Sequence, residues 1–163
     1  MGLPFHLKKS PHPHLYRRKL DKSGLAVLNV GLILSYEVMI PSGDVSLKMV
    51  QGLFLDCANQ LAGFTHVGFR GRRSDATHSV SVGIGPTLFY RKDWKNLPGY
   101  VDEGLFQRTD TWQYRFIWYA GEVQLDTNIS PRWAFSTTLI PGYPEFVAVT
   151  SGLQYLSTAP TTP

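Results

Sequence analysis

The chain has 163 residues, of which 43% are hydrophobic, 13% aromatic and 17% charged, a composition that excludes an intrinsically disordered chain and fits one domain. The formal net charge of +4 is local: residues 1–22 hold six Lys or Arg and one Asp (+5), and the remaining 10 basic and 11 acidic residues sum to −1. We therefore expect residues 1–22 to be a solvated, mobile basic segment. Such an arm can also bind nucleic acid or anionic lipid head groups, but no nucleic-acid partner is predicted.

Targeting and cross-linking signals are sparse. Cys57 is the only cysteine, so no disulfide can form within the chain. Basic residues 17–19 and the apolar stretch after them superficially look like a signal peptide. We reject that interpretation because Asn29 and Glu37 interrupt the stretch and no small-residue cleavage site follows. No stretch has the roughly 18 apolar residues that a membrane-spanning helix requires.

In chain order, apolar residues recur at every second position, which is the period of a β-strand. Within residues 78–93, for example, Val80, Val82 and Ile84 alternate with Ser81 and Gly83. No segment has a convincing helical period, so the sequence predicts an all-β fold. The predicted strands cover about 25–40, 45–56, 62–71, 78–93, 112–127, 132–140 and 145–156.

Two details of these segments affect the architecture. The apolar phase of 112–127 changes between Trp118 and Val123, which predicts a β-bulge near Ala120-Gly121. Turn-forming residues occupy the short connections 41–44, 128–131 and 141–144. The stretch 95–111 is much longer, and we expect it to be a lid or another surface feature.

Two kinds of β-barrel share this alternation and differ in which face meets water. A soluble lipocalin-like carrier turns its apolar face inward and needs a charged exterior, whereas an outer-membrane barrel turns its apolar face to lipid. The second face of 79–87 is Ser, Ser, Gly, Gly and Thr, which suits a narrow interior better than a water-facing surface. We therefore predict an antiparallel up-and-down transmembrane β-barrel of about eight strands in the bacterial outer membrane, and keep the soluble carrier as an alternative.

We divide the chain into the basic segment 1–22, a barrel domain 23–156 and a C-terminal tail 157–163. An even strand number requires one more strand than the seven predicted. Residues 5–20 supply it weakly, or the sequence given lacks a first strand together with its signal peptide. Counting back from a periplasmic C-terminus, the connections 57–61, 94–111 and 141–144 share the outer end. Those at 41–44, 72–77 and 128–131 share the periplasmic end.

Three residues form a conceivable catalytic group. A cysteine nucleophile needs a base that removes its proton and a third group that orients the base, and Cys57, His66 and Asp56 supply these types. The alternative is that Cys57 is inert packing and His66 satisfies a local hydrogen bond. Glu37 and Arg70, if both point inward, are expected to pair in the lumen. No cofactor is predicted, and no metal site, because the other histidines cluster mainly in the basic segment.

Two sequence motifs, together with the Asp56-Cys57 pair, resemble those of a known family of barrels. The stretch GIGPTLFYRKDW (83–94) is similar to a Gly-rich strand that ends in an Arg-x-Asn/Asp-Trp turn, and TTLIPGY (137–143) to a penultimate strand with an Ile-Pro-Gly corner. Together with Asp56-Cys57, in the place of an Asp-Ser pair, they make residues 52–156 resemble the lipid A palmitoyltransferase family of eight-stranded outer-membrane barrels. The family's catalytic His precedes that pair, and residues 25–40 contain no His.

The resemblance implies acyl transfer from a phospholipid to lipid A, with a hydrocarbon ruler inside the barrel. The expected partners are then membrane lipids, namely phospholipid and lipopolysaccharide, and the protein is expected to be a monomer. A non-enzymatic structural or interaction barrel, whose loop 94–111 contacts a partner, is the alternative of a different class.

Overall fold

The computed structural model describes residues 2–6, 12–41, 45–75, 77–142 and 146–156, and the predicted tail 157–163 lies outside these ranges. Its elements in chain order are β1 (Gly2–His6), the 3₁₀-helix η1 (Pro13–Leu15), β2 (Val30–Met39), β3 (Val45–Leu55), β4 (Leu61–Ser74), β5 (His78–Lys92), β6 (Gln107–Arg108), β7 (Trp112–Ser130), β8 (Trp133–Gly142) and β9 (Phe146–Tyr155). Within the described ranges, no helix is long and apolar enough to cross a membrane.

The predicted all-β class is confirmed, and the seven predicted strands correspond to β2, β3, β4, β5, β7, β8 and β9. The weakly predicted extra strand in residues 5–20 is β1, which lies earlier, at residues 2–6, and η1 occupies residues 13–15. Strand β6 is a two-residue addition to the edge of β7.

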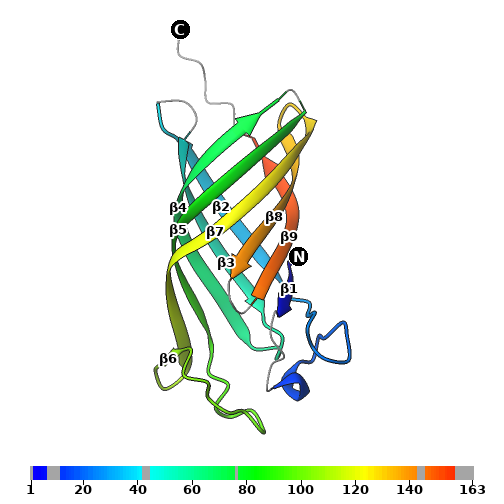
Figure 1. Ribbon diagram of the computed structural model, residues 1–163, viewed down its shortest axis with the longest axis vertical. Coiled ribbons are helices and arrows are strands. Elements are labelled where there is room, and N and C mark those ends of the chain that lie inside the picture. Colours follow the sequence, from blue (N-terminus) through cyan, green and yellow to red (C-terminus); the bar gives the residue numbers. More distant parts are fainter. Residues whose placement is uncertain (1, 7–11, 42–44, 76, 143–145, 157–163) are drawn as a thin grey trace.

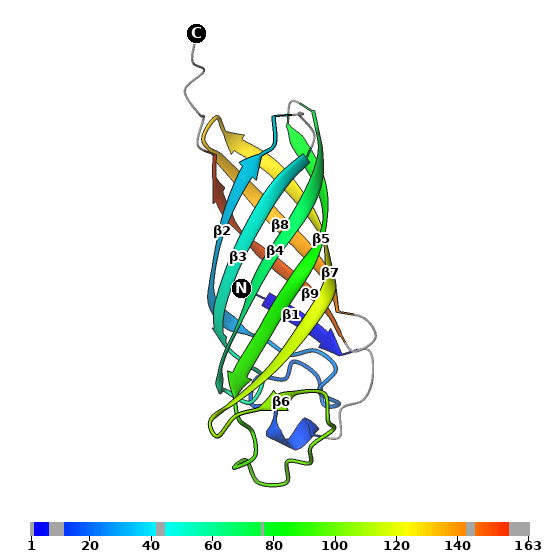
Figure 2. The same ribbon diagram turned by 90° about the vertical axis from the view of Figure 1, so that its left-hand side faces the viewer.

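The strands form one antiparallel sheet in the order β1-β9-β8-β7-β5-β4-β3-β2, which is an up-and-down arrangement. Figures 1 and 2 show the sheet curled about the long axis of the molecule, with the strands inclined to that axis. Within the described ranges no pairing joins β1 to β2, the two ends of this order. The sheet is therefore an incomplete barrel.

The two faces of the curled sheet differ sharply in chemistry. Ser81 is fully buried on the inner face, whereas its neighbour Val82 has 58% of its surface exposed on the outer face. The outer face carries exposed apolar side chains from every long strand: Leu32, Leu34, Met49, Leu53, Phe69, Val82, Ile84, Phe116, Leu125, Phe135, Leu139 and Leu153. The polar and small residues of the alternation thus face inward, and the apolar residues face outward.

A β-bulge interrupts β7, slightly earlier than predicted. Gly85 pairs with Ala120 and Thr87 with Ile117, so β7 has one residue more than β5 over this stretch. The extra residue places Trp118 and Tyr119 both on the outer surface, at 68% and 78% exposure. The predicted position at Ala120-Gly121 is therefore too late by one or two residues.

One end of the sheet is closed by a cap, which we define as residues 12–28, the turn 56–60 and the loop 93–111. It lies at the lower end in Figure 1, with η1 and β6. Its apolar centre consists of Tyr16, Val27, Cys57, Ala58 and Trp94, all of them buried. At the opposite end β2, β4 and β7 finish and β3, β5 and β8 begin (Figure 1), which agrees with the predicted grouping of the connections.

Residues 12–28 are packed in the cap, whereas the sequence suggested a solvated segment up to residue 22. The backbone N–H of Arg17 donates to the carbonyl of Cys57 at 2.8 Å, and Lys19 forms a β-bridge with Val27. The predicted boundary after residue 22 falls inside this small hairpin. Lys19 and Lys22 are exposed while Tyr16 and Val27 are buried, and the charge count alone could not reveal this packing.

Candidate functional site

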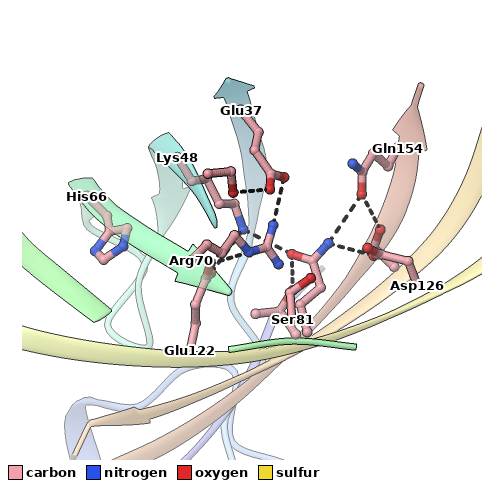
Figure 3. Close-up of polar contacts among 12 residues, drawn as sticks. Glu37, Lys48, His66, Arg70, Ser81, Glu122, Asp126 and Gln154 are labelled. Carbon is pink, nitrogen blue, oxygen red and sulfur yellow. Dashed lines mark hydrogen bonds and ion pairs between the residues drawn. The ribbon is translucent and has the colours of Figure 1, made fainter. Parts of the chain in front are cut away.

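A network of charged side chains lies in the interior of the curled sheet (Figure 3). At its centre lies Arg70 from β4, only 1% exposed. Its Nη1 lies 2.9 Å from a carboxylate oxygen of Glu37 on β2, and its Nε lies 3.3 Å from one of Glu122 on β7. The expected pairing of Glu37 with Arg70 is therefore confirmed.

Two further cations complete this interior network. Lys48 of β3 lies 3.0 Å from Glu122 and also donates to the side-chain carbonyl of Gln124 at 3.0 Å. Arg72 of β4 bridges Glu37 at 3.4 Å and Asp126 at 3.5 Å. Lys48, Arg70 and Arg72 thus face the carboxylates of Glu37, Glu122 and Asp126, so the network is balanced in charge.

Neutral polar groups extend the network across the sheet (Figure 3). Gln124 donates to Asp126 at 2.5 Å and to Gln154 of β9 at 3.2 Å, and Ser136 of β8 donates to Gln154 at 3.1 Å. The glycines of β5 make room for these side chains, since a Cβ on Gly83 would lie 3.1 Å from Cγ of Glu122. The small residues of the 79–87 alternation therefore accommodate long charged side chains.

Aromatic side chains occupy the interior between this network and the cap. The ring centroids of Phe54 and Phe89 lie 6.1 Å apart, and Phe106 of the loop lies 6.0 Å from Phe89. The guanidinium of Arg91 lies 4.1 Å from the Phe106 ring and 3.9 Å from that of Trp94. At the end opposite the cap a hollow of about 200 Å³ borders Arg72 and Asp126. The interior is thus filled by side chains over much of its length.

Asp56 organises the turn between β3 and β4. One carboxylate oxygen accepts from the backbone N–H of Ala58 at 2.9 Å and of Gln60 at 2.8 Å, and the other accepts from the indole N–H of Trp94 at 2.9 Å. Burial raises the pKa of the Asp56 carboxyl above its ordinary value, against the opposing effect of these hydrogen bonds. The side chain thus ties the turn to the loop of the cap.

Cys57 lies next to it, 8% exposed and packed in the apolar centre of the cap. Burial, together with the nearby negative charge of Asp56, raises the pKa of the thiol from 9.0 to about 12. A nucleophilic cysteine requires the thiolate, which this environment disfavours at neutral pH. The geometry suits a packing role.

His66 belongs to the interior rather than to the cap. It is 7% exposed, and its Nδ1 lies 2.7 Å from the hydroxyl oxygen of Thr87 on β5. Figure 3 shows its ring on the same side of the sheet as Lys48 and Arg70. In the part of the chain that the structure describes, no hydrogen bond joins His66 to Asp56 or Cys57. The structure therefore connects Asp56 with Trp94 and His66 with Thr87.

Sequence reasoning missed most of the interior network. Lys48, Glu122 and Asp126 all occupy the small-residue phase of their strands, so the alternation already placed charged groups on the inner face. A charged residue at an inward position of a strand was therefore the sequence signal that could have identified the network. The described residues contain no group of three or more His, Cys, Asp or Glu arranged to hold a metal ion.

Comparisons with protein-family models, with curated proteins and with solved structures found no match to this chain. The resemblance to the lipid A palmitoyltransferase family stays a prediction from sequence motifs.

Proposed function

We propose that the chain is a small β-barrel protein of the bacterial outer membrane, with a lumen closed by side chains. The observation that carries this proposal is that the outer and inner faces of the curled sheet differ in polarity. The outer face is apolar on every long strand, and the inner face holds a charge-balanced network. This is the distribution that a bilayer requires of a membrane-spanning barrel.

The soluble lipocalin-like alternative needs the opposite distribution. A lipid carrier in water requires an apolar interior that receives the ligand and a polar exterior. Exposed side chains such as Leu32, Phe69 and Leu153, each more than 60% exposed, would make a poor surface in water. The faces therefore support the membrane protein over the carrier.

Strand directions support closure into an eight-stranded barrel in the bilayer. β2 and β9 run in the same direction, so a strand between them has to run antiparallel to both. β1 already runs antiparallel to β9, with Gly2 opposite Thr150 and His6 opposite Phe146. Because an open sheet edge is not tolerated in hydrocarbon, we propose that β1 also pairs with β2 in the membrane.

The filled interior favours a structural or interaction role over a pore. Ion pairs block the central section, and the cap covers one end, where its loop is available to a partner. Acyl transfer, the activity implied by the family resemblance, stays a prediction, since the buried Cys57 thiol is poorly suited to attack an ester. The proposed partners are membrane lipids, and the proposed state is a monomer.

Substitution of Val82 by Arg tests the membrane assignment. Arginine on a lipid-facing strand costs about 2–4 kcal/mol near the bilayer midplane, so Val82→Arg should insert poorly into phospholipid vesicles. Val101 in the cap loop is similarly exposed, at 65%, and Val101→Arg is the matched control that should insert normally. Insertion is measured by protease protection and by the heat-modifiable barrel band on gels. Recovery of the wild type as a monomer soluble without detergent would refute the proposal.

A further inference from the structure

A polar cluster interrupts the apolar outer face near the cap. Gln51 of β3 and Thr65 of β4 are register partners, and Tyr90 of β5 lies beside them on the same face. Exposed leucines surround the cluster, among them Leu53 and Leu61. An outward amide and two hydroxyls on such a wall need partners in a bilayer.

Most of these polar groups find hydrogen-bond partners within the cluster. The Gln51 amide nitrogen donates to the Tyr90 hydroxyl oxygen at 2.6 Å and to the backbone carbonyl of Phe64 at 3.1 Å. The Gln51 side-chain carbonyl accepts from the Thr65 hydroxyl at 2.8 Å. The Tyr90 oxygen is therefore an acceptor here, and its own O–H retains a proton to donate. Among the described residues, no acceptor is bound to that O–H.

The position of the Tyr90 ring is set by its neighbours. A Cβ on Gly63 would lie 2.7 Å from ring atoms of Tyr90, so only glycine lets the ring lie this close to the strand. On the other side the Trp112 ring meets Tyr90 edge to face, with centroids 6.1 Å apart. The hydroxyl is thus held by Gln51 and by packing on two sides.

A cation lies beside this hydroxyl. Lys92 is two residues further along β5, on the same face, at a spacing of about 7 Å along the strand. Its ammonium lies 4.7 Å from the centroid of the same Trp112 ring. Lys92 ends β5 and Trp112 begins β7, so both lie where the apolar wall stops.

We propose that Tyr90 and Lys92 form a binding site for a glycerophospholipid, with the lipid phosphate on Lys92 and an acyl-ester carbonyl on Tyr90. This inference rests on the proposed membrane location. Ester and phosphate groups lie at the boundary where aromatic and basic side chains gather, in the order in which Tyr90 and Lys92 follow each other toward the strand end. The neighbouring leucines contact the acyl chain.

Lipid titration of the full chain tests the site. The protein is folded in alkyl maltoside micelles, which contain neither phosphate nor ester, and short-chain diacylphosphatidylglycerol is added. Native mass spectrometry counts the lipid retained. Tyr90→Phe should weaken binding about five- to tenfold through loss of one hydrogen bond, and Lys92→Gln should weaken it and remove its salt dependence. Tyr155→Phe and Lys95→Gln change exposed side chains that make no contact with the cluster among the described residues, and these controls are expected to bind as the wild type does.

A diether analogue isolates the ester contact. It keeps the phosphate and lacks both ester carbonyls, so the wild type should bind it as weakly as Tyr90→Phe binds the diester, and Tyr90→Phe should cause no further loss. Inorganic phosphate at the same concentration should not displace the lipid. Unchanged affinity in both Tyr90→Phe and Lys92→Gln, or displacement by inorganic phosphate alone, would overturn the inference. Vesicle insertion, measured separately with Val82→Arg, shows whether the proposed function itself fails.

Discussion

Replacement of Arg70 by Met removes the central charge of the interior network and keeps an unbranched, shorter side chain. Arg70 is the most buried cation described, and it contacts both Glu37 and Glu122. Its loss leaves each carboxylate with one remaining cation, Arg72 at 3.4 Å and Lys48 at 3.0 Å. The interior then carries three carboxylates and two cations in a low-dielectric space.

The magnitude follows from that geometry. Removal of one partner of a buried ion pair destabilises a protein by about 3–5 kcal/mol, because a charge is left uncompensated. Since both carboxylates keep a second cation, we expect the lower end, about 3 kcal/mol. Neutralisation of one carboxylate in addition should recover part of this loss, so Arg70→Met with Glu37→Gln should be more stable than Arg70→Met alone.

Denaturant unfolding in detergent micelles, followed by tryptophan fluorescence, measures these differences. Arg73 lies on the same strand but is exposed, so Arg73→Met is the matched control and should change stability by at most about 0.5 kcal/mol. Equal stability of Arg70→Met and Arg73→Met would refute the view that the interior network holds the sheet in its curled form.

Further outcomes are expected at Cys57, in the loop of the cap and at Asp21. With the Cys57 pKa raised from 9.0 to about 12, the folded chain keeps a proton that the unfolded chain loses, so stability should fall from pH 9 to 12, by about 1.4 kcal/mol per pH unit more than in Cys57→Ala. Maleimide should label the thiol only after unfolding. Deletion of 98–108 removes Tyr100 and Phe106 from the cap but no strand except β6, so the heat-modifiable band should persist while Trp94 fluorescence shifts to the red. Hydrogen bonds from Ser23 and Ala26 lower the pKa of Asp21 to about 2, so amide protection in the 18–28 hairpin should fall as the pH drops from 4 to 2, and Asp21→Asn should abolish that dependence in hydrogen exchange.

The strands could be predicted because one face of each is uniform. A period of two assigns every residue to a face, so the strands and their inward phase follow from sequence alone. The bulge was predictable as a change of phase, but its position was not. Trp118 fits the earlier phase and Val123 the later one, and the residues between them are compatible with several positions of the extra residue.

The cap could not be predicted in the same way. Tyr16 and Val27 meet Trp94 through contacts between segments some 70 residues apart, and neither segment has a period that identifies its buried face. The basic residues between them dominate the charge count, although Arg17, Lys19 and Lys22 are exposed and take no part in the apolar centre. Composition therefore suggested a free segment where packing occurs.

The candidate site shows how proximity along the chain differs from proximity in a sheet. Cys57 lies in the turn, and His66 is five residues into β4, which corresponds to roughly 16 Å along a strand at 3.3 Å per residue. Cys57 and His66 are near in sequence but lie at different positions along the strand direction. Lys48 and Glu122 are 74 residues apart, yet their atoms meet at 3.0 Å because the sheet curls β3 and β7 toward each other. Alternation places both charges on the inner face, but the curl and the stagger of the strands decide which of them pair, and these depend on all the strands together.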